Sequence, residues 1–168
     1  MDASNFPDRV NQVTDAKSNL ECSLTILQGA DGGASAVVVE LSNLSKDHDV
    51  NLKVNTEMSA FIMLTATDQQ GTVLSMPAKR FNTSETQQFV MVRIERASSH
   101  QWRVPIANQL PVSDIPEQGM KGRLVVNVAL LFSKASGDKQ PSDVDFQNSL
   151  LTLYDMDILF TRNALRGE

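Results

Sequence analysis

Residues 121–133, KGRLVVNVALLFS, decide the fold class of this chain. Apolar residues recur at every second position, which is the period of a β-strand because successive side chains of a strand point to opposite faces. One face carries Leu124, Val126, Val128, Leu130 and Phe132. The other face carries Val125, Ala129 and Leu131. Apolar residues on both faces predict a central strand.

The same alternation extends in both directions from this segment. We predict about nine strands, over residues 20–27, 34–43, 50–54, 60–67, 72–76, 87–96, 100–106, 121–133 and 150–162. Turn residues separate them at short intervals, whereas a parallel sheet needs long helical connections. The chain is therefore predicted to be all-β, an antiparallel β-sandwich. In the last strand the apolar pattern changes phase near Asp155, which predicts a β-bulge.

The core of the sandwich is predicted from the apolar faces of these strands. Those faces hold Val37, Val39, Leu41, Val90, Val92, Ile94, Trp102, Val104, Leu124, Val126, Val128 and Leu130. Trp102 is in phase with Val104, so we expect it in the core rather than in an exposed sugar-binding platform. Cys22 lies on the apolar side of its strand and is expected to be a small buried hydrophobe.

The two ends of the chain are predicted to flank a single domain. Residues 1–19 form an N-terminal arm, residues 20–163 form the sandwich, and residues 164–168 form a C-terminal tail. Phe6, Val10 and Val13 recur at helical spacing, so we predict a short helix within residues 5–16 of the arm. Residues 141–149 are the second candidate for a short helix.

Composition argues against several classes of protein. The 168 residues carry a net charge of −5, which disfavours nucleic acid as a partner because such binders neutralise phosphates with a basic face. No apolar run approaches the ~20 residues of a membrane helix. One cysteine permits neither an internal disulfide nor a four-cysteine zinc site. The first twenty residues lack the pattern of a secretory signal, so we expect a cytoplasmic protein or an exported chain whose signal has been removed.

Catalytic motifs are missing from the sequence as well. There are two histidines, His48 and His100, and no Gly-x-Ser-x-Gly elbow for a serine nucleophile. Gly29, Gly32 and Gly33 precede a strand, whereas phosphate and dinucleotide loops require a helix N-terminus. We therefore expect neither enzymatic activity nor a cofactor.

One loop of acidic residues is a weak candidate for a calcium site. Asp138, Asp143 and Asp145 lie in residues 134–145, KASGDKQPSDVD, and calcium takes six to eight oxygen ligands from flexible loops. Their spacing does not match the calcium loop of helix-loop-helix proteins. The alternative is that these carboxylates are solvated and bind no metal.

The order of features between Val37 and Val128 carries a family resemblance. A strand ends in LSNLS (residues 41–45), a second ends near Val54, a hairpin follows around Gly71, and VPI (residues 104–106) precedes a strong strand after Gly122. This order resembles an immunoglobulin-like or transglutaminase-type accessory sandwich, with a jelly-roll-like sandwich as the alternative. The resemblance implies a fold and no functional residue, because the cysteine pair and the early tryptophan of antibody domains are missing.

Charge is segregated along the chain. Residues 59–134 contain eight basic and five acidic side chains, whereas residues 1–58 contain four basic and nine acidic ones. We predict that Arg93, Arg96 and Arg103 form a solvent-facing basic patch on adjacent strands, suited to the acidic loops of a neighbouring subunit. The alternative is that the fold mixes these segments and the surface charge averages out.

These patterns leave two classes of function. We expect a non-enzymatic structural or interaction subunit that self-associates into a homo-oligomeric shell, tube or filament. In that assembly Phe6, Val10 and Val13 dock the N-terminal arm on another subunit, although an arm that folds back on its own sandwich is equally compatible with the sequence. The alternative function is a soluble binding module, such as a protein inhibitor or adaptor, including a calcium-dependent one.

Overall fold

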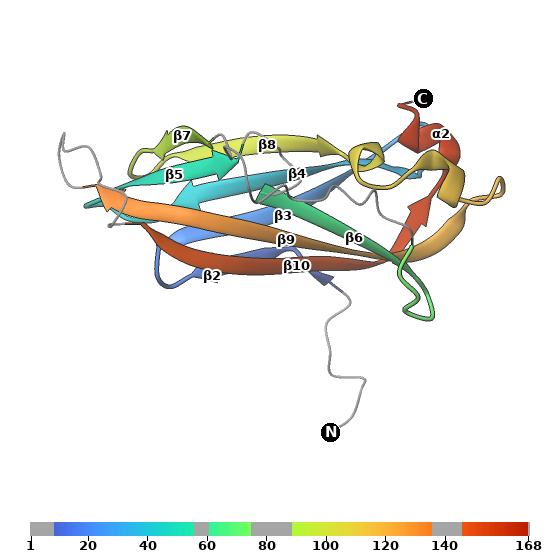
Figure 1. The fold of residues 1–168 in the computed structure, drawn as a ribbon, viewed down its shortest axis with the longest axis horizontal. Helices are drawn as coiled ribbons and strands as arrows, with labels where there is room; N and C mark the ends of the chain where they lie inside the picture. Colours follow the sequence, from blue (N-terminus) through green and yellow to red (C-terminus); the bar gives the residue numbers. More distant parts are fainter. Residues whose placement is uncertain (1–8, 56–60, 75–88, 136–145, 168) are drawn as a thin grey trace, which may run out of the picture.

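The computed structural model describes residues 9–55, 61–74, 89–135 and 146–167. In these residues ten β-strands form two antiparallel sheets that pack face to face (Figure 1). The predicted all-β sandwich is therefore confirmed. The described helices are single turns: η2 (Ile106–Asn108), η3 (Val112–Asp114) and α2 (Arg162–Leu165). None of them has the length or the apolar content to cross a membrane.

The larger sheet has six strands and is built around the longest, β9 (Met120–Ala135). Its other strands are β1 (Arg9–Val10), β5 (Asp49–Asn55), β6 (Ile62–Asp68), β7 (Phe89–Ile94) and β10 (Gln147–Phe160). One edge of β9 pairs with β10, and the other edge is shared by β6 and β5. β1 lies beyond β10, and β7 lies beyond β5 at the opposite edge of the sheet.

The smaller sheet has four strands. In spatial order they are β2 (Gln12–Asp15), β3 (Leu20–Gln28), β4 (Ala34–Asn43) and β8 (Ser99–Pro105). Between β3 and β4 the turn is tight, with Gly32 at a φ of 84° that favours glycine. The chain passes from one sheet to the other between β1 and β2, between β4 and β5, and on both sides of β8. These crossings enclose one core between the sheets.

The bulge predicted near Asp155 is confirmed. Asp155 pairs with Leu124 and Ile158 pairs with Gly122, so β10 has one more residue than β9 between the two pairs. Asp157, inside this bulge, has a left-handed backbone with a φ of 58°. Because of the extra residue, the buried positions of β10 are odd-numbered before the bulge and even-numbered after it. The bulge therefore keeps both halves of the strand facing the core.

The predicted core residues are buried except for Val90 and Val92. Trp102 packs edge-on against Phe61, with ring centres 5.0 Å apart, which confirms its expected place in the core. Cys22 is fully buried as expected, and burial raises the pKa of its thiol to about 12. A thiol with that pKa stays protonated at neutral pH and is a poor nucleophile.

The helix predicted within residues 5–16 is wrong where the segment is described. Residues 9–15 form two strands in opposite sheets, β1 on β10 and β2 on β3. The chain crosses between the sheets at Asn11, so the helical spacing of Val10 and Val13 arises from two strands and not from one helical face. The second predicted helix is also wrong over residues 147–149, which begin β10. In residues 72–74 the predicted strand is reduced to one bridge between Val73 and Thr67.

The C-terminal residues pack against the sandwich. Thr161 caps α2 by accepting a hydrogen bond from the Ala164 N–H at 3.1 Å. Gly33, in the β3–β4 turn, leaves room for this cap, because a Cβ at that position would clash with the Thr161 side chain. Ala164 and Leu165 are buried, so the first residues of the predicted tail belong to the core.

The outer edge of β6 is completed by a side chain. Gln109 is buried, its Nε2 donates to the Ile62 carbonyl, and its Oε1 accepts from the Leu64 N–H, both at 2.8 Å. These are the bonds that a neighbouring strand makes in a sheet. Further along the edge, Leu74 N–H donates to the Ala66 carbonyl at 2.9 Å. The β6 edge is therefore occupied over most of its length.

Candidate functional site

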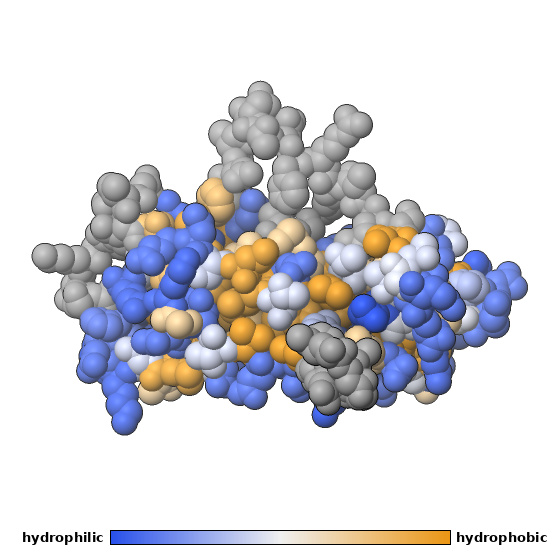
Figure 2. All heavy atoms as spheres, turned by 90° about the horizontal axis from the view of Figure 1, so that it is seen from below, coloured by the Kyte–Doolittle hydropathy of each residue, from blue (hydrophilic) through white to orange (hydrophobic). Residues whose placement is uncertain are grey.

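The outer face of the larger sheet, opposite the core, carries an apolar surface. Its apolar residues are Met63, Phe89, Met91, Val125, Ala129, Leu131 and Leu150. We call this set the outer apolar face. Leu150 is 63% exposed, Met91 48% and Phe89 43%. Figure 2, seen from below Figure 1, looks at the edge of the sandwich on which β2 and β10 lie and shows apolar side chains gathered in the middle of that edge as well.

The register of the strands brings only part of this face together, since Met91 and Phe89 lie opposite the polar Lys53 and Asn55 of β5. Leu150 lies opposite Ala129, and Met63 lies opposite Asn127. Asn127 is polar but accepts a hydrogen bond from the Thr152 hydroxyl at 2.7 Å, so these two polar groups satisfy each other on the face. Exposed sheet faces of monomers are normally polar, and contiguous apolar surface marks an interaction site.

The central position predicted for residues 121–133 is confirmed, because β9 lies between β10 on one edge and β5 and β6 on the other. The outward residues Val125, Ala129 and Leu131 are half-buried, whereas the inward residues of the same strand are at most 2% exposed. The double-sided apolar pattern of this segment was the sequence signal for the outer apolar face. A strand with one face in the core and an apolar second face open to a partner has this pattern.

The inward-facing side chains of β7 become more exposed toward the start of the strand. Ile94 is buried, Val92 is half-buried and Val90 is 52% exposed, so the predicted core position of Val90 is wrong. The reason is that, among the described residues, β7 is the last strand of its sheet and pairs with β5 alone. Alternation identifies the face on which a residue lies, but it does not distinguish an edge strand from a central one.

Arg93, Arg96 and Arg103 do not form the predicted basic patch. β7 pairs with β5 in the larger sheet and β8 pairs with β4 in the smaller one, so they are not adjacent strands. Arg93 instead binds the Asp49 carboxylate with its Nε and Nη2, at 3.0 and 2.5 Å. The backbone N–H of Arg96 donates to the same carboxylate at 2.9 Å. Arg103 is exposed on β8, away from this cluster.

The Asp49 cluster joins the start of β5 to the turn between β7 and β8. Asp49 is 7% exposed, and the hydrogen bond from Arg93, followed by the one from the Arg96 backbone, holds the pKa of its carboxyl below the ordinary range. The two arginines remain about half exposed at their side chains. Their role within this chain is therefore to anchor one end of the sandwich.

The remaining predicted site residues lie elsewhere. Val13 packs against this chain's own core and Val10 pairs with Tyr154 of β10, as in the alternative in which the arm folds back on its own sandwich. Phe6 lies outside the described residues. The calcium candidates Asp138, Asp143 and Asp145 lie outside them too. Within the described ranges, no three His, Cys, Asp or Glu side chains gather closely enough to hold a metal ion.

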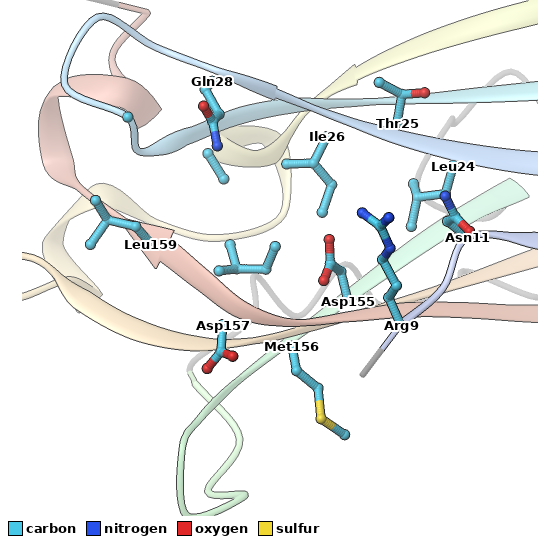
Figure 3. Close-up of a pocket in the computed structure, with 13 residues that line it drawn as sticks. Arg9, Asn11, Leu24, Thr25, Ile26, Gln28, Asp155, Met156, Asp157 and Leu159 are labelled. Atoms are coloured by element: carbon cyan, nitrogen blue, oxygen red, sulfur yellow. The ribbon is translucent and has the colours of Figure 1, made fainter. Parts of the chain in front are cut away.

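A cleft of about 440 Å³ lies where β3 and β10 separate (Figure 3). β2 covers β3 only as far as Ser23, and β1 pairs with β10 only at Tyr154 and Asp155. Beyond these points the facing edges of β3 and β10 have no partner strand among the described residues. The cleft therefore opens next to the bulge of β10. The sequence predicted the bulge but gave no sign of the cleft, which depends on where β1 and β2 end.

The cleft combines an apolar floor with two charged groups. Leu24 and Ile158 are buried and Ile26 is half-buried at its base. Figure 3 shows the guanidinium of Arg9 and the carboxylate of Asp155 pointing into the space between the strands.

The surroundings of Asp155 disfavour the charged form of its carboxyl. Burial raises its pKa above the ordinary value, and the charge of Asp157 acts in the same direction. Arg9, directly opposite Asp155 in the β1–β10 pair, partly offsets both effects. A group with a perturbed pKa in a partly apolar cleft is a feature of binding sites.

Comparison with protein-family models and with curated proteins finds no match to this chain. The resemblance to immunoglobulin-like or transglutaminase-type accessory sandwiches therefore stays a prediction, and function has to be argued from the surface and the cleft.

Proposed function

We propose that this protein is a non-enzymatic interaction subunit that self-associates through the outer apolar face of its larger sheet. The observation that supports this proposal is the exposure of Leu150, Met91 and Phe89 on a sheet face that water would otherwise contact. A face of this kind is stabilised when a second copy covers it, because apolar surface is removed from water on both subunits.

The expected energy is sufficient for association to matter. Full burial of a large apolar side chain contributes about 1.5–3 kcal/mol, and the three residues are roughly half exposed, so covering them supplies about 2–4 kcal/mol per subunit. In a two-fold dimer the same face is used twice, which doubles this contribution before the cost of association is subtracted. The half-buried residues of β9 add to the contact.

A shell, tube or filament requires a second contact, since one face joins only two subunits. β7 is suited to that role because it is an edge strand in the part of the chain that the structure describes and because Val90, on its inner side, is exposed. Edge strands with exposed apolar residues pair readily with other chains. The proposed assembly is thus built from one face and one edge of the same sheet.

Light scattering coupled to size exclusion, at several protein concentrations, tests the proposal. We expect a multimer for the unmodified chain and a monomer for the double variant Leu150→Lys with Met91→Lys. Val73→Lys is the matched control, because Val73 is 61% exposed but lies in a turn beyond β6. The control is expected to remain multimeric, and Trp102 fluorescence confirms that each variant is folded. A monomeric unmodified chain, or a double variant that stays multimeric, refutes the proposal.

A further inference from the structure

We propose that the cleft between β3 and β10 binds an extended peptide segment of a partner protein, with a lysine or arginine side chain of that segment placed against Asp155. The cleft lies at the junction of the two sheets and is separate from the outer apolar face. This binding activity is therefore independent of self-association, and it is the specific form that the binding-module function takes here.

The backbone of β3 offers hydrogen bonds to such a segment. The N–H of Leu24 donates to the Asn11 carbonyl at 2.8 Å, so it points to the edge on which β2 lies. The groups of an antiparallel strand point to its two edges alternately, so Ile26 presents its N–H and carbonyl to the same edge. No described strand pairs with Ile26 on that side, because β2 ends opposite Ser23. An extended peptide that continues the line of β2 supplies the missing partner.

The lining of the cleft selects a basic side chain. Lysine and arginine combine an apolar stem with a charged tip, which matches an apolar floor of Leu24, Ile26 and Ile158 next to a carboxylate. Arg9 and Asp155 point into the cleft in Figure 3, and because Arg9 only partly offsets the burial of Asp155, a second cation beside this carboxylate is favourable. Asp157 points away from the cleft, and its negative charge raises the pKa of Asp155.

The combination of these features favours a peptide over a free amine or a second copy of this chain. A free amine satisfies Asp155 but leaves the backbone groups of Ile26 without a partner. A second copy could bring Arg103, which is exposed on β8, an edge strand among the described residues, so the titration keeps a second copy as a separate outcome. The proposed occupant is a segment of a different protein, because the proposed self-association uses the outer apolar face and not this cleft.

Nuclear magnetic resonance titration of the ¹⁵N-labelled full chain tests the proposal. The probe is the capped pentapeptide acetyl-Thr-Val-Lys-Val-Thr-amide, with three comparison probes: the same peptide with glutamate in place of lysine, the same peptide with proline in place of the second valine, and acetyl-lysine methylamide. We expect the lysine peptide to shift the amide signals of Ile26 and Asp155. Each comparison probe is expected to bind at least tenfold more weakly.

Two charge-neutralising variants provide the second measurement. Asp155→Asn is expected to weaken binding of the lysine peptide at least tenfold. The matched control Asp47→Asn, an exposed acid in the loop between β4 and β5, is expected to leave binding within twofold. Because the probe comparison uses the unmodified chain, the proposal remains testable if Asp155→Asn fails to fold.

Several outcomes overturn the proposal. Equal binding of the lysine and glutamate peptides removes the role of Asp155. Equal binding of acetyl-lysine methylamide makes the cleft a simple cation site, and equal binding of the proline peptide removes the strand pairing. No shift of Ile26 up to millimolar peptide excludes the site altogether. Shifts at Ile26 that follow protein concentration and not peptide assign the cleft to a second copy.

Discussion

Replacement of Gln109 by methionine is expected to be among the most damaging single changes in this sandwich. The substitution keeps the length of the side chain but removes both polar atoms, so the Ile62 carbonyl and the Leu64 N–H lose their partners at the edge of β6. A buried polar group left without a hydrogen bond costs about 1–3 kcal/mol. Two such groups predict a loss of about 2–6 kcal/mol, which is a large part of the 5–15 kcal/mol that typically stabilises a domain.

Urea unfolding followed by the fluorescence of Trp102, the single tryptophan of the chain, measures this loss. Gln101→Met is the control, because Gln101 is an exposed glutamine whose side chain donates a hydrogen bond to Glu40 on the neighbouring strand β4. The control is expected to change the free energy of unfolding by less than about 0.5 kcal/mol. A cost below about 1 kcal/mol for Gln109→Met would mean that the edge of β6 is open to water and that the reasoning is wrong.

Replacement by glutamate separates the two hydrogen bonds. An ionised carboxylate at position 109 still accepts from the Leu64 N–H, but it cannot donate to the Ile62 carbonyl and repels it. The introduced carboxyl is therefore stabilised in its protonated form, and its pKa in the folded state is raised above the unfolded value of about 4.3. A raised pKa gives stability that is present below pH ~4 and lost as the pH rises. Gln109→Glu is thus expected to lose stability between pH 4 and pH 7 relative to Gln109→Met.

Three further predictions concern two core positions and the Asp49 cluster. Val126→Ala, at a fully buried position of β9, is expected to cost about 1–3 kcal/mol in urea unfolding, and no change would place Val126 outside the core. Asp49→Asn is expected to destabilise the protein most at neutral pH. Since the pKa of Asp49 is lowered chiefly by Arg93, its contribution declines as the pH falls below the unfolded value of about 3.9, and a difference in thermal midpoint that does not shrink between pH 5 and pH 2.5 would contradict this. Cys22 is expected to react with a disulfide reagent only after unfolding, and rapid labelling of the native protein would show that it is not buried.

The strands of this protein were predictable because most of them bury one face. Alternation located β3, β4, β5, β6, β8, β9 and β10, and it placed the bulge of β10 near Asp155. Inside a sandwich the period of two is imposed by the core, so a change of phase has to coincide with an extra residue. The buried positions of Cys22 and Trp102 followed from the same argument.

The errors share one physical cause, which is that alternation carries no information about neighbours in space. Val10 and Val13 have the spacing of a helix because the chain changes sheets between them. Arg93 and Arg103 were placed on paired strands because β7 and β8 are consecutive, although each pairs with a different strand. The role of Gln109 had no signal at all, since its partners are 45 and 47 residues away in the chain. Pairing partners are set by long-range topology, which a local pattern does not encode.

The outer apolar face and the cleft differ in how the sequence encodes them, and this difference bears on the two proposals. Val125, Ala129 and Leu131 make β9 apolar on both faces, so the local sequence of this strand already encodes the outer apolar face. The cleft, in contrast, arises because β1 and β2 stop short of the ends of the strands they cover. Substitutions on the outer face should therefore alter assembly without moving the strands, whereas lengthening β2 along β3 should close the cleft and leave assembly intact. Assembly and peptide binding can in this way be removed separately. A single change that abolished both activities would mean that the outer apolar face and the cleft are parts of one interface.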